Sequence, residues 1–214
     1  KHRSEPFGKF VNIAVLEGDE IKIIDDRATT VPDCPGLLKS LLGHVTPSAP
    51  HESVNLLVHL AASMRAHHRG GALLVVPDGS PEWRESIVEP IQYDVEPDFP
   101  ELADLMRREA DERRTHEWQD DLRRAVDAMA GLTAVDGATI MTRRYHLLAF
   151  GAKILRRRSR PAVDRVLATE PIEGREPALV TPAQLGGTRH LSAAQFVQDQ
   201  PDALALVASQ DGRF

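Results

Sequence analysis

Hydrophobic and polar positions divide the chain into segments of different periodicity. Residues 11–24, "VNIAVLEGDEIKII", contain two runs of β-favouring residues around a central Gly-Asp pair, a pattern that predicts a β-hairpin. Further along, Pro47 and Pro50 prevent regular structure in a segment that has the composition of a linker. We therefore interpret residues 1–50 as a small N-terminal module that contains a hairpin.

From Val54 onward the apolar residues recur at helical spacing, and the helix that they predict can end at Gly70-Gly71. The continuous apolar run 72–76 follows, bounded by glycines and by a Pro-Asp-Gly turn, as expected of a buried strand. A Ser-Pro pair then has the character of a helix start. This order predicts an α/β fold over residues 51–214, a layered mixed sheet flanked by helices.

The longest helical pattern covers residues 99–132. Its middle, "RREADERRTHE" (107–117), has almost nothing to bury, which fits a solvated helical face or a break between two helices. A helix that binds a partner is the alternative. Beyond it, we expect a hairpin that opens at residues 136–138 and turns at Arg143-Arg144. We also expect a basic loop, a helix and a last buried strand, at 156–165, 191–199 and 203–209.

Composition narrows the function classes. The net charge of -6 argues against a nucleic-acid partner, so no DNA binding is expected. Cys34 is the one cysteine, which excludes an internal disulfide and fits a reducing compartment. No apolar run approaches the roughly 20 residues that span a bilayer, and we find no signal peptide. We expect a cytoplasmic piece of a longer protein, without membrane partners. His67-His68 fits a helix C-terminus better than a metal site, because no third ligand is visible.

The stretch "GGTRHLSAAQF", Gly186 to Phe196, places an arginine and a histidine at a glycine-loosened helix entrance. A helix N-terminus presents unpaired N–H groups and positive potential, and the glycines let a ligand approach the backbone. Arginine adds a fork of donors matched to phosphate oxygens. The pattern therefore favours an anion, phosphate above all. Taken alone, it also fits an ordinary capped and solvated turn, as "DGA" at 136–138 fits an ordinary Asp-Gly turn.

The order of these motifs resembles that of the diadenylate cyclase domain, the fold of the DNA-integrity scanning protein and of the membrane-associated cyclases. A glycine-led strand, "RGGALLVVPD", is followed by a helical stretch, by "DGA" at a hairpin start, and about fifty residues later by "GGTRHLSAAQ" and a closing strand. The resemblance covers residues 51–214. It implies that fold, and enzymes of the family condense two ATP molecules into cyclic di-AMP.

The resemblance also implies roles for individual residues. Asp136 matches the metal-associated aspartate, and it would hold Mg²⁺ or Mn²⁺ with the nucleotide only if the cyclase-like metal site is retained. Ser209 matches a serine near the phosphates. The other matching positions, which would line the nucleotide and grip its phosphates, are Gly137, Ala138, Lys153, Ile154, Gly187, Thr188, Arg189 and His190.

Two departures from the family pattern separate this chain from the enzymes. The enzymes continue Thr-Arg-His with a second arginine, where this chain has Leu191. The membrane-type enzymes carry metal-serving glutamates after the serine, where Gln210 and Asp211 stand here. Phosphoryl transfer depends on cationic groups and metal that stabilise developing charge, whereas binding needs less. The chain is thus more similar to the non-catalytic sensor branch of the family, sometimes labelled DACNV.

Three hypotheses remain open on the sequence. The first is a sensor domain that binds an adenine nucleotide, foremost cyclic di-AMP, without turning it over, for which no catalytic residue is assigned. The second is an active cyclase in which Asp211 or Arg143-Arg144 compensates for the lost groups. The third is an interaction domain that docks partners through 107–117 and 156–160. A homodimer, and effector domains or proteins outside this chain, are compatible with the first.

Overall fold

The structure is a computed structural model, and it describes residues 13–17, 20–24, 56–109, 111–158, 160–169 and 178–210. The helices among these residues are α2 (Leu56–Ala66), α3 (Glu101–Arg107), α4 (His116–Leu132), α5 (Pro182–Leu185) and α6 (Thr188–Asp199), with short 3-10 turns η1 (Glu82–Ser86) and η2 (Glu112–Arg114). The strands are β1 (Ile13–Glu17), β2 (Glu20–Ile24), β3 (Gly71–Val76), β4 (Tyr93–Phe99), β5 (Ala138–Thr142), β6 (Leu147–Ala152), β7 (Val166–Thr169), β8 (Ala178–Val180) and β9 (Leu204–Ala208).

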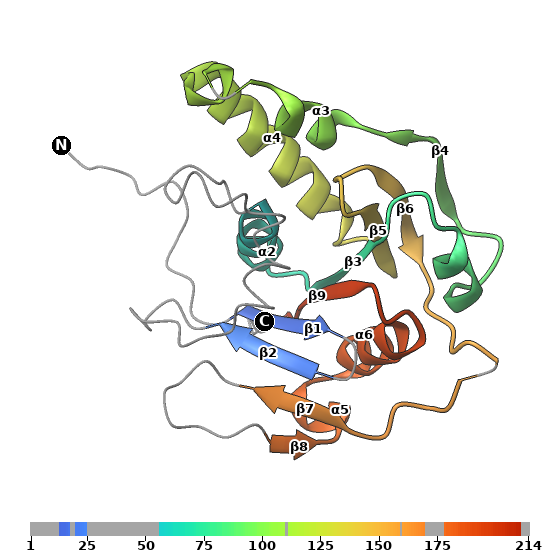
Figure 1. The fold of residues 1–214 in the computed structure, drawn as a ribbon. Helices are drawn as coiled ribbons and strands as arrows, with labels where there is room; N and C mark the ends of the chain where they lie inside the picture. The colour runs from blue at the N-terminus through green and yellow to red at the C-terminus, as the bar shows by residue number, and fades with distance from the viewer. Residues whose placement is uncertain are drawn as a thin grey trace.

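The fold is mixed α/β, because these strands form one sheet of mixed direction with helices on both faces (Figure 1). The sheet order is β4-β6-β5-β3-β9-β1-β2-β7-β8. At its centre, β3 runs parallel to β5 and antiparallel to β9, and β6 pairs antiparallel with β5. The predicted buried strands 72–76 and 203–209 correspond to β3 and β9, which lie side by side.

Alternation along β3 assigns its side chains to two cores. Leu73 and Val75 pack on the face covered by α2, α3 and α4. Leu74 and Val76 pack on the other face, against α6 and the η1 segment. All six residues of β3 are buried, as expected of a strand covered on both faces. The four central strands are thus covered on both faces, and the loops at their two ends lie outside the two cores.

The N-terminal hairpin belongs to the same sheet. β1 and β2 pair antiparallel within the stretch where the sequence predicts a hairpin, and β1 also pairs with β9 through Val15 and Leu206. β2 in turn pairs parallel with β7. The hairpin therefore bridges the central strands and β7, and Cys34 and the predicted linker lie outside the described residues.

The structure agrees with one sequence prediction about the helices and corrects others. The pattern over 99–132 is two helices, α3 and α4, separated by η2, which agrees with the predicted break. Trp118 joins them, because its buried indole N–H donates to the carbonyl of Leu105 over 2.9 Å. The helix predicted after Ser80-Pro81 is wrong in length, since only the short η1 forms. The strands β4, β7 and β8 were not predicted.

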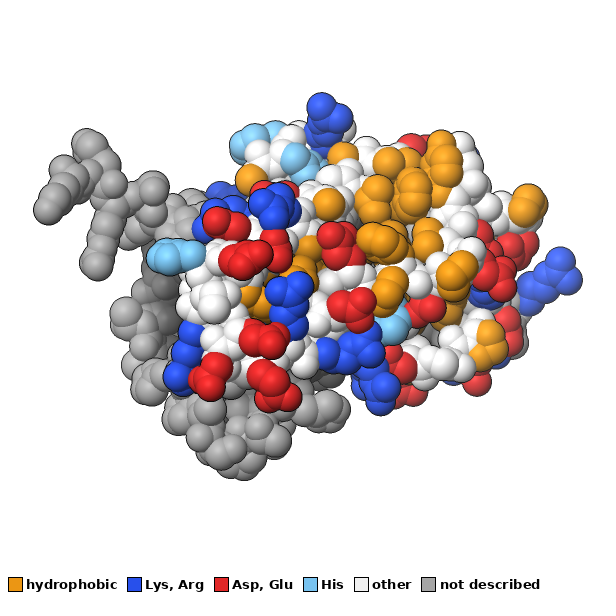
Figure 2. All heavy atoms as spheres, turned by 90° about the horizontal axis from the view of Figure 1, so that it is seen from above, with side chains coloured by type: hydrophobic (Ala, Val, Ile, Leu, Met, Phe, Trp, Pro, Cys, Tyr) orange, Lys and Arg blue, Asp and Glu red, His pale blue; other side chains and the backbone are white. Residues whose placement is uncertain are grey.

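The charged stretch between the two apolar stripes lies on the surface. α3, α4 and η2 carry ion pairs between arginines and aspartates three residues apart, such as Arg123 with Asp120 at 3.1 Å. Figure 2 shows this face with acidic and basic side chains interspersed, and hydrophobic side chains gathered toward the side where β4 lies. Such exposed pairs contribute little to stability, so this face fits the solvated interpretation. Among the described residues, no helix has both the length and the apolar character needed to cross a membrane.

A buried carboxylate holds the basic loop in place. Asp199 is fully buried, and its carboxylate accepts hydrogen bonds from the backbone N–H of Arg157 over 2.7 Å and from the side-chain amide of Gln195 over 2.9 Å. Gln195 also accepts from the N–H of Val163 over 2.8 Å and donates to the carbonyl of Pro161 over 3.1 Å. The loop is thus fixed to α6 through its backbone, while most of its arginine side chains remain exposed.

Replacing Asp199 with alanine is expected to lower the free energy of unfolding by about 2–4 kcal/mol, because two buried donors lose their acceptor. Urea unfolding followed by circular dichroism measures the change. The exposed Asp202→Ala is the matched control, expected within about 0.5 kcal/mol of the parent chain. Equal changes in the free energy of unfolding for the two substitutions would show that the hydrogen bonds of Asp199 do not stabilise the fold.

The turn between α2 and β3 depends on a neutral histidine. The Nδ1 atom of His67 accepts a hydrogen bond from the backbone N–H of Arg69 over 3.1 Å, and Nε2 lies 3.3 Å from the hydroxyl of Thr133. Burial, and then the charge of Arg69, lower the pKa of His67 below its ordinary value. The sequence prediction of a helix C-terminus is right in position, but the ring connects the turn to the end of α4 rather than interacting as a cation with the helix dipole.

Stability should therefore fall as the pH drops through the ordinary histidine pKa of about 6.5, because the unfolded state binds the proton more readily than the folded state. Burial lowers the pKa of His59 as well, so both histidines act in the same direction. We expect His67→Asn, which keeps an acceptor near the Nδ1 position and does not titrate, to lose less stability between about pH 7 and about pH 5. Unfolding in urea at both pH values measures this, and identical pH profiles would contradict it.

Candidate functional site

The first part of the site is the turn that leads into β5. Gly137 has φ 110°, and a Cβ added there would lie 2.5 Å from the carbonyl carbon of Gly151 on β6. Only glycine fits a position with both this backbone conformation and this contact. Asp136, immediately before it, is exposed. The turn thus brings the carboxylate of Asp136 to the end of the β5–β6 ladder, where Ala138 pairs with Ala152.

Lys153 and Ile154 follow β6 directly and are held by the η1 segment. The carbonyl of Lys153 accepts from the N–H of Val88 over 2.9 Å, and Ile154 forms a β-bridge with Ile87. These backbone bonds fix the chain on both sides of the Lys153 side chain, which is exposed. A cation and an apolar side chain therefore lie next to the Asp136 turn.

The third part is the start of α6. The helix begins at Thr188 with Gly187 at its N-cap, and no side chain caps it and no acidic residue occupies its first turn. The positive end of the helix dipole is therefore not offset within the helix. His190 is 8% exposed, and its ring occupies the space beside Gly186, where a Cβ would lie 2.1 Å from Nδ1. The glycine before the helix thus makes room for the histidine.

Arg189 connects α6 to the start of β3. A Cβ on Gly70 would lie 2.7 Å from an Nη atom of Arg189, and 3.1 Å from the carbonyl oxygen of Ala208 on β9. Gly70 has φ 68°, so it is required for its conformation as well as for this contact. The sequence predicts Gly70 at the boundary between a helix and a strand, with no role in the site. The absent side chain at this position is what lets the guanidinium lie over the ends of β3 and β9.

These segments line one cavity of about 710 Å³. All ten residues for which the sequence predicts nucleotide contact belong to its lining: Asp136, Gly137, Ala138, Lys153, Ile154, Gly187, Thr188, Arg189, His190 and Ser209. Sequence reasoning missed Ala72, Ala152, Ser192 and Ala208. Gln210, which it named only as a departure from the family's glutamates, completes the lining. Leu191, in contrast, is 43% exposed and is not part of it.

The size and chemistry of the cavity suit a small polar ligand. Its volume lies within the roughly 300–1,000 Å³ typical of ligand pockets. Lys153 and Arg189 are cations, Asp136 is the one acidic residue of the lining, and Thr188, Ser192 and Ser209 add hydroxyls. Ile154 and alanines from β3, β5, β6 and β9 are the apolar members of the lining. A ligand with a flat apolar part and an anionic part matches this division.

The sequence predicts that Asp136 would hold a metal ion if the cyclase-like metal site is retained. The described part of the chain contains no group of three histidine, cysteine, aspartate or glutamate side chains that could hold an ion. Asp136 alone fits a Mg²⁺ or Mn²⁺ ion that arrives with phosphate oxygens, since such ions use one or two carboxylates together with the nucleotide. Asp211 lies outside the described residues.

Comparison with known proteins gives no relative. No family model matches the chain, and no curated protein or solved structure matches it either.

Proposed function

We propose that this domain is a nucleotide sensor that binds an adenine nucleotide, foremost cyclic di-AMP, in the cavity between the Asp136 turn and the start of α6, without turning it over. One observation supports the proposal above all. Residues from four segments that are far apart in sequence, 136–138, 153–154, 187–190 and 209, line the same cavity. The resemblance to the diadenylate cyclase domain selected them without reference to any spatial proximity.

The site residues divide the task of binding. Arg189 and the uncapped N-terminus of α6 bind phosphate oxygens, and charge-assisted bonds of this kind contribute on the order of 1.5–3 kcal/mol. The apolar part of the lining, Ile154 with the alanines of β3, β5 and β6, accommodates the base. Lys153 offers a second cation in the same lining.

The same lining argues against efficient turnover. Phosphoryl transfer needs cationic groups and metal that stabilise charge on the transferred phosphoryl group and the leaving pyrophosphate. Where the cyclases have their second arginine, the exposed Leu191 supplies no charge. We expect that the loss removes several kcal/mol of transition-state stabilisation while leaving ground-state binding largely intact.

A thermal-shift panel separates the proposal from an interaction domain without a ligand. Binding to the folded state alone raises stability, so cyclic di-AMP at about 100 times its dissociation constant should raise the melting temperature by about 5–10 °C. Cyclic di-GMP should raise it less. A panel in which no nucleotide stabilises the protein would favour the interaction domain.

Product analysis separates the sensor from the active cyclase. The chain is incubated with ATP and Mn²⁺, and the mixture is resolved by chromatography. We expect ATP to persist and no cyclic di-AMP to accumulate. The retention of Asp136 and His190 in the cavity is the feature that would favour the cyclase, and formation of cyclic di-AMP would establish it.

A further inference from the structure

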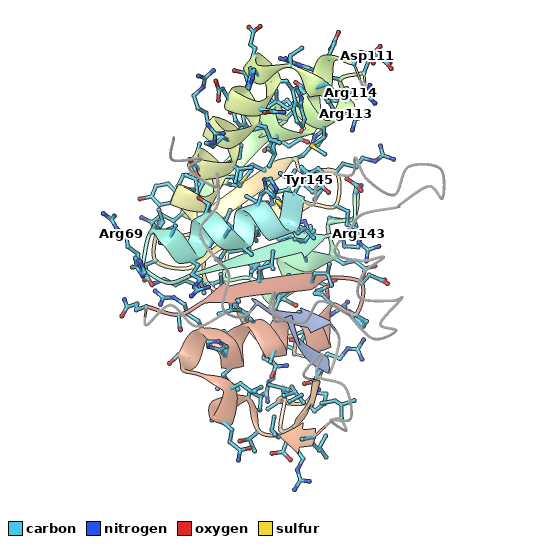
Figure 3. The ribbon with its side chains drawn as sticks, turned by 90° about the vertical axis from the view of Figure 1, so that its left-hand side faces the viewer. Arg69, Asp111, Arg113, Arg114, Arg143 and Tyr145 are labelled. Atoms are coloured by element: carbon cyan, nitrogen blue, oxygen red, sulfur yellow. The ribbon has the colours of Figure 1, made fainter. Side chains whose placement is uncertain are left out.

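A second cavity, of about 840 Å³, lies at the opposite ends of the same four central strands. Val75, Thr142, Leu148 and Leu204 line it from β3, β5, β6 and β9, whereas Ala72, Ala138, Ala152 and Ala208 of those strands line the cavity beside Asp136. The two linings share no residue. In Figure 3, Arg143 marks this end of the sheet and Arg69 the other.

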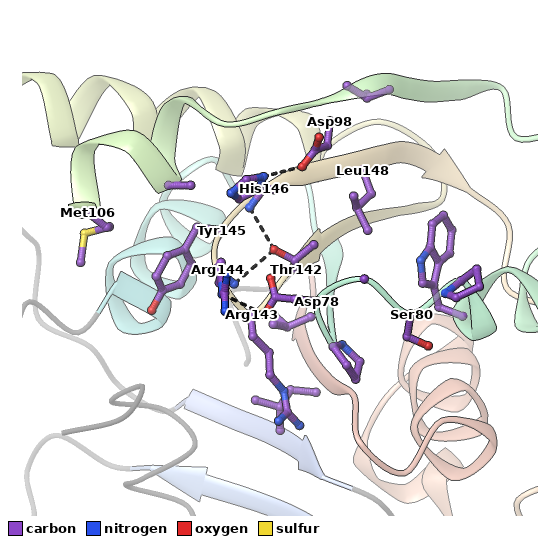
Figure 4. Close-up of a pocket in the computed structure, with 18 of the residues that line it drawn as sticks. Asp78, Ser80, Asp98, Met106, Thr142, Arg143, Arg144, Tyr145, His146 and Leu148 are labelled. Atoms are coloured by element: carbon purple, nitrogen blue, oxygen red, sulfur yellow. Dashed lines mark hydrogen bonds and ion pairs between the residues drawn. The ribbon is translucent and has the colours of Figure 1, made fainter. Parts of the chain in front are cut away.

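This end carries the carboxyl ends of the parallel strands β3 and β5, the usual place for ligands in α/β sheets. Its central feature is the turn from β5 to β6. The hydroxyl of Thr142 accepts from the backbone N–H of Arg144 over 3.1 Å and from that of His146 over 3.2 Å. His146 also contacts the carboxylate of Asp98 on β4 (Figure 4). The turn is therefore fixed by its own hydrogen bonds and by the edge strand.

Tyr145 occupies an unusual backbone position in this turn. Its φ of 69° lies in the left-handed region, where a hairpin of this kind usually has glycine or asparagine and where a bulky residue is uncommon. The ring is half-buried and packs against the hydrophobic core under α2, α3 and α4. Figure 4 shows it between the turn and Met106 of α3. The turn thus holds an aromatic side chain in the cavity wall against the preference of the backbone.

The interior of the cavity is apolar, and charged side chains of both signs surround it. The apolar lining comes from α2, β3, β4, α3, β6 and β9: Leu57, Val75, Val95, Ala103, Met106, Leu148 and Leu204. Four arginines and two aspartates supply the formal charges of the lining: Arg84, Arg107, Arg143, Arg144, Asp78 and Asp98.

Arg143 and Arg144, both in the β5–β6 turn, are the two arginines of the lining without a close carboxylate partner. With Arg84 and Arg107 paired outside the lining, the four remaining groups balance at 2 − 2, and the cationic character is local to the turn because Asp98 contacts His146. Arg84 is neutralised by carboxylates outside the lining, because it binds Asp94 through two contacts of 2.9 Å and Glu89 through one of 3.2 Å. Arg107 pairs with a neighbouring aspartate on α3. Arg143 instead donates to the neutral backbone carbonyl of Asp202. Arg144 has only a long contact of 3.8 Å with Asp78, and its side chain is 80% exposed.

We propose that this cavity binds a small organic anion with a flat apolar body, the body lying against Tyr145 and Met106 and the carboxylate or phosphate bound by Arg143 and Arg144. The apolar interior provides the area that such a body buries, and the two arginines provide the charge-assisted bonds. This cavity shares no residue with the nucleotide cavity, so the proposal does not depend on the sensor function.

Naphthalene derivatives that share one apolar body and differ in charge test the proposal. The probes are 1-naphthoate, 1-naphthyl phosphate, neutral 1-naphthol and cationic 1-naphthylmethylammonium, titrated by calorimetry against the full chain. We expect one saturable site for each anion, with about tenfold weaker binding of the naphthol and weaker binding still of the cation. Equal affinities for all four, or no saturable binding of either anion, would overturn the proposal.

Charge-removing variants locate the site. The double variant Arg143→Gln, Arg144→Gln should weaken both anions by about tenfold or more while leaving 1-naphthol unchanged. Arg144→Gln alone serves as the second variant, because this exposed side chain makes little contribution to folding. Arg123→Gln, on the solvent face of α4, should leave anion affinity unchanged. Arg189→Ala tests whether the probes bind in the nucleotide cavity instead, and weaker anion binding in that variant would overturn the proposal. An equal loss in the Arg123 variant would show nonspecific charge attraction, and no loss in the double variant would place the anion elsewhere.

Discussion

Replacing Arg189 with alanine is expected to weaken the binding of cyclic di-AMP by about tenfold or more. The guanidinium lies over Gly70, close to the carbonyl oxygen of Ala208, at the ends of β3 and β9 and beside the N-terminus of α6. It is therefore the group best placed to meet a phosphate in the cavity. A charge-assisted bond contributes on the order of 1.5–3 kcal/mol, which corresponds to roughly a ten- to 150-fold change in affinity. Isothermal titration calorimetry measures the difference.

Two further variants make this result specific. Arg189→Lys keeps the charge but loses the planar fork, and we expect an intermediate affinity. Arg123→Ala removes an exposed arginine of α4, remote from the cavity lining, and should bind like the parent chain. Unchanged affinity in Arg189→Ala would remove the phosphate role from this residue.

Replacing Gly137 with alanine is expected to lower the free energy of unfolding by about 2–5 kcal/mol. A Cβ at this position would lie 2.5 Å from the carbonyl carbon and 2.7 Å from the carbonyl oxygen of Gly151, so the backbone of β6 must move. The positive φ of 110° adds backbone strain of order 1–3 kcal/mol, and the overlap adds a similar amount. Urea unfolding measures the loss, and nucleotide binding should weaken in parallel because Asp136 moves with the turn.

The matched control is Gly131→Ala within α4. No atom lies within 4 Å of a Cβ at that position, and the residue is exposed. Alanine should stabilise the helix there by about 0.5–1 kcal/mol. If the two substitutions shifted stability in the same direction and by similar amounts, the close approach of the β5 turn to β6 would not constrain the site.

The parts of the fold that could be predicted are those whose signal is local. The run 72–76 is apolar throughout because β3 is covered on both faces, and Ser209 follows a similar run. β4 escaped prediction because nearly all of its residues are exposed and it contains Pro97. Such a strand is tolerated only at a sheet edge, where it pairs with β6 alone. β7 and β8 are short, and β7 pairs with β2, a distant segment that local patterns cannot identify.

In the candidate site, too, the features with a local sequence signal could be predicted and those that depend on distant segments could not. The residues of the "DGA" and "GGTRHL" motifs could be selected from the sequence because glycines and charges at turns leave a recognisable pattern. The role of Gly70 could not, because it depends on the approach of Arg189 from a helix more than a hundred residues later. The second cavity was equally invisible. Arg143 and Arg144 have the pattern of an ordinary hairpin turn, and the apolar residues of the lining come from six separate elements.

The central claim is that the pocket holds an adenylate while lacking the charges that would drive bond formation. Calorimetric titration of the unmodified chain with cyclic di-AMP, beside cyclic di-GMP and ATP, tests it most directly. We predict saturable binding of cyclic di-AMP to each chain, with an affinity at least about tenfold above that for cyclic di-GMP. Absence of heat and of saturation for all three nucleotides, with a folded protein, would contradict the account.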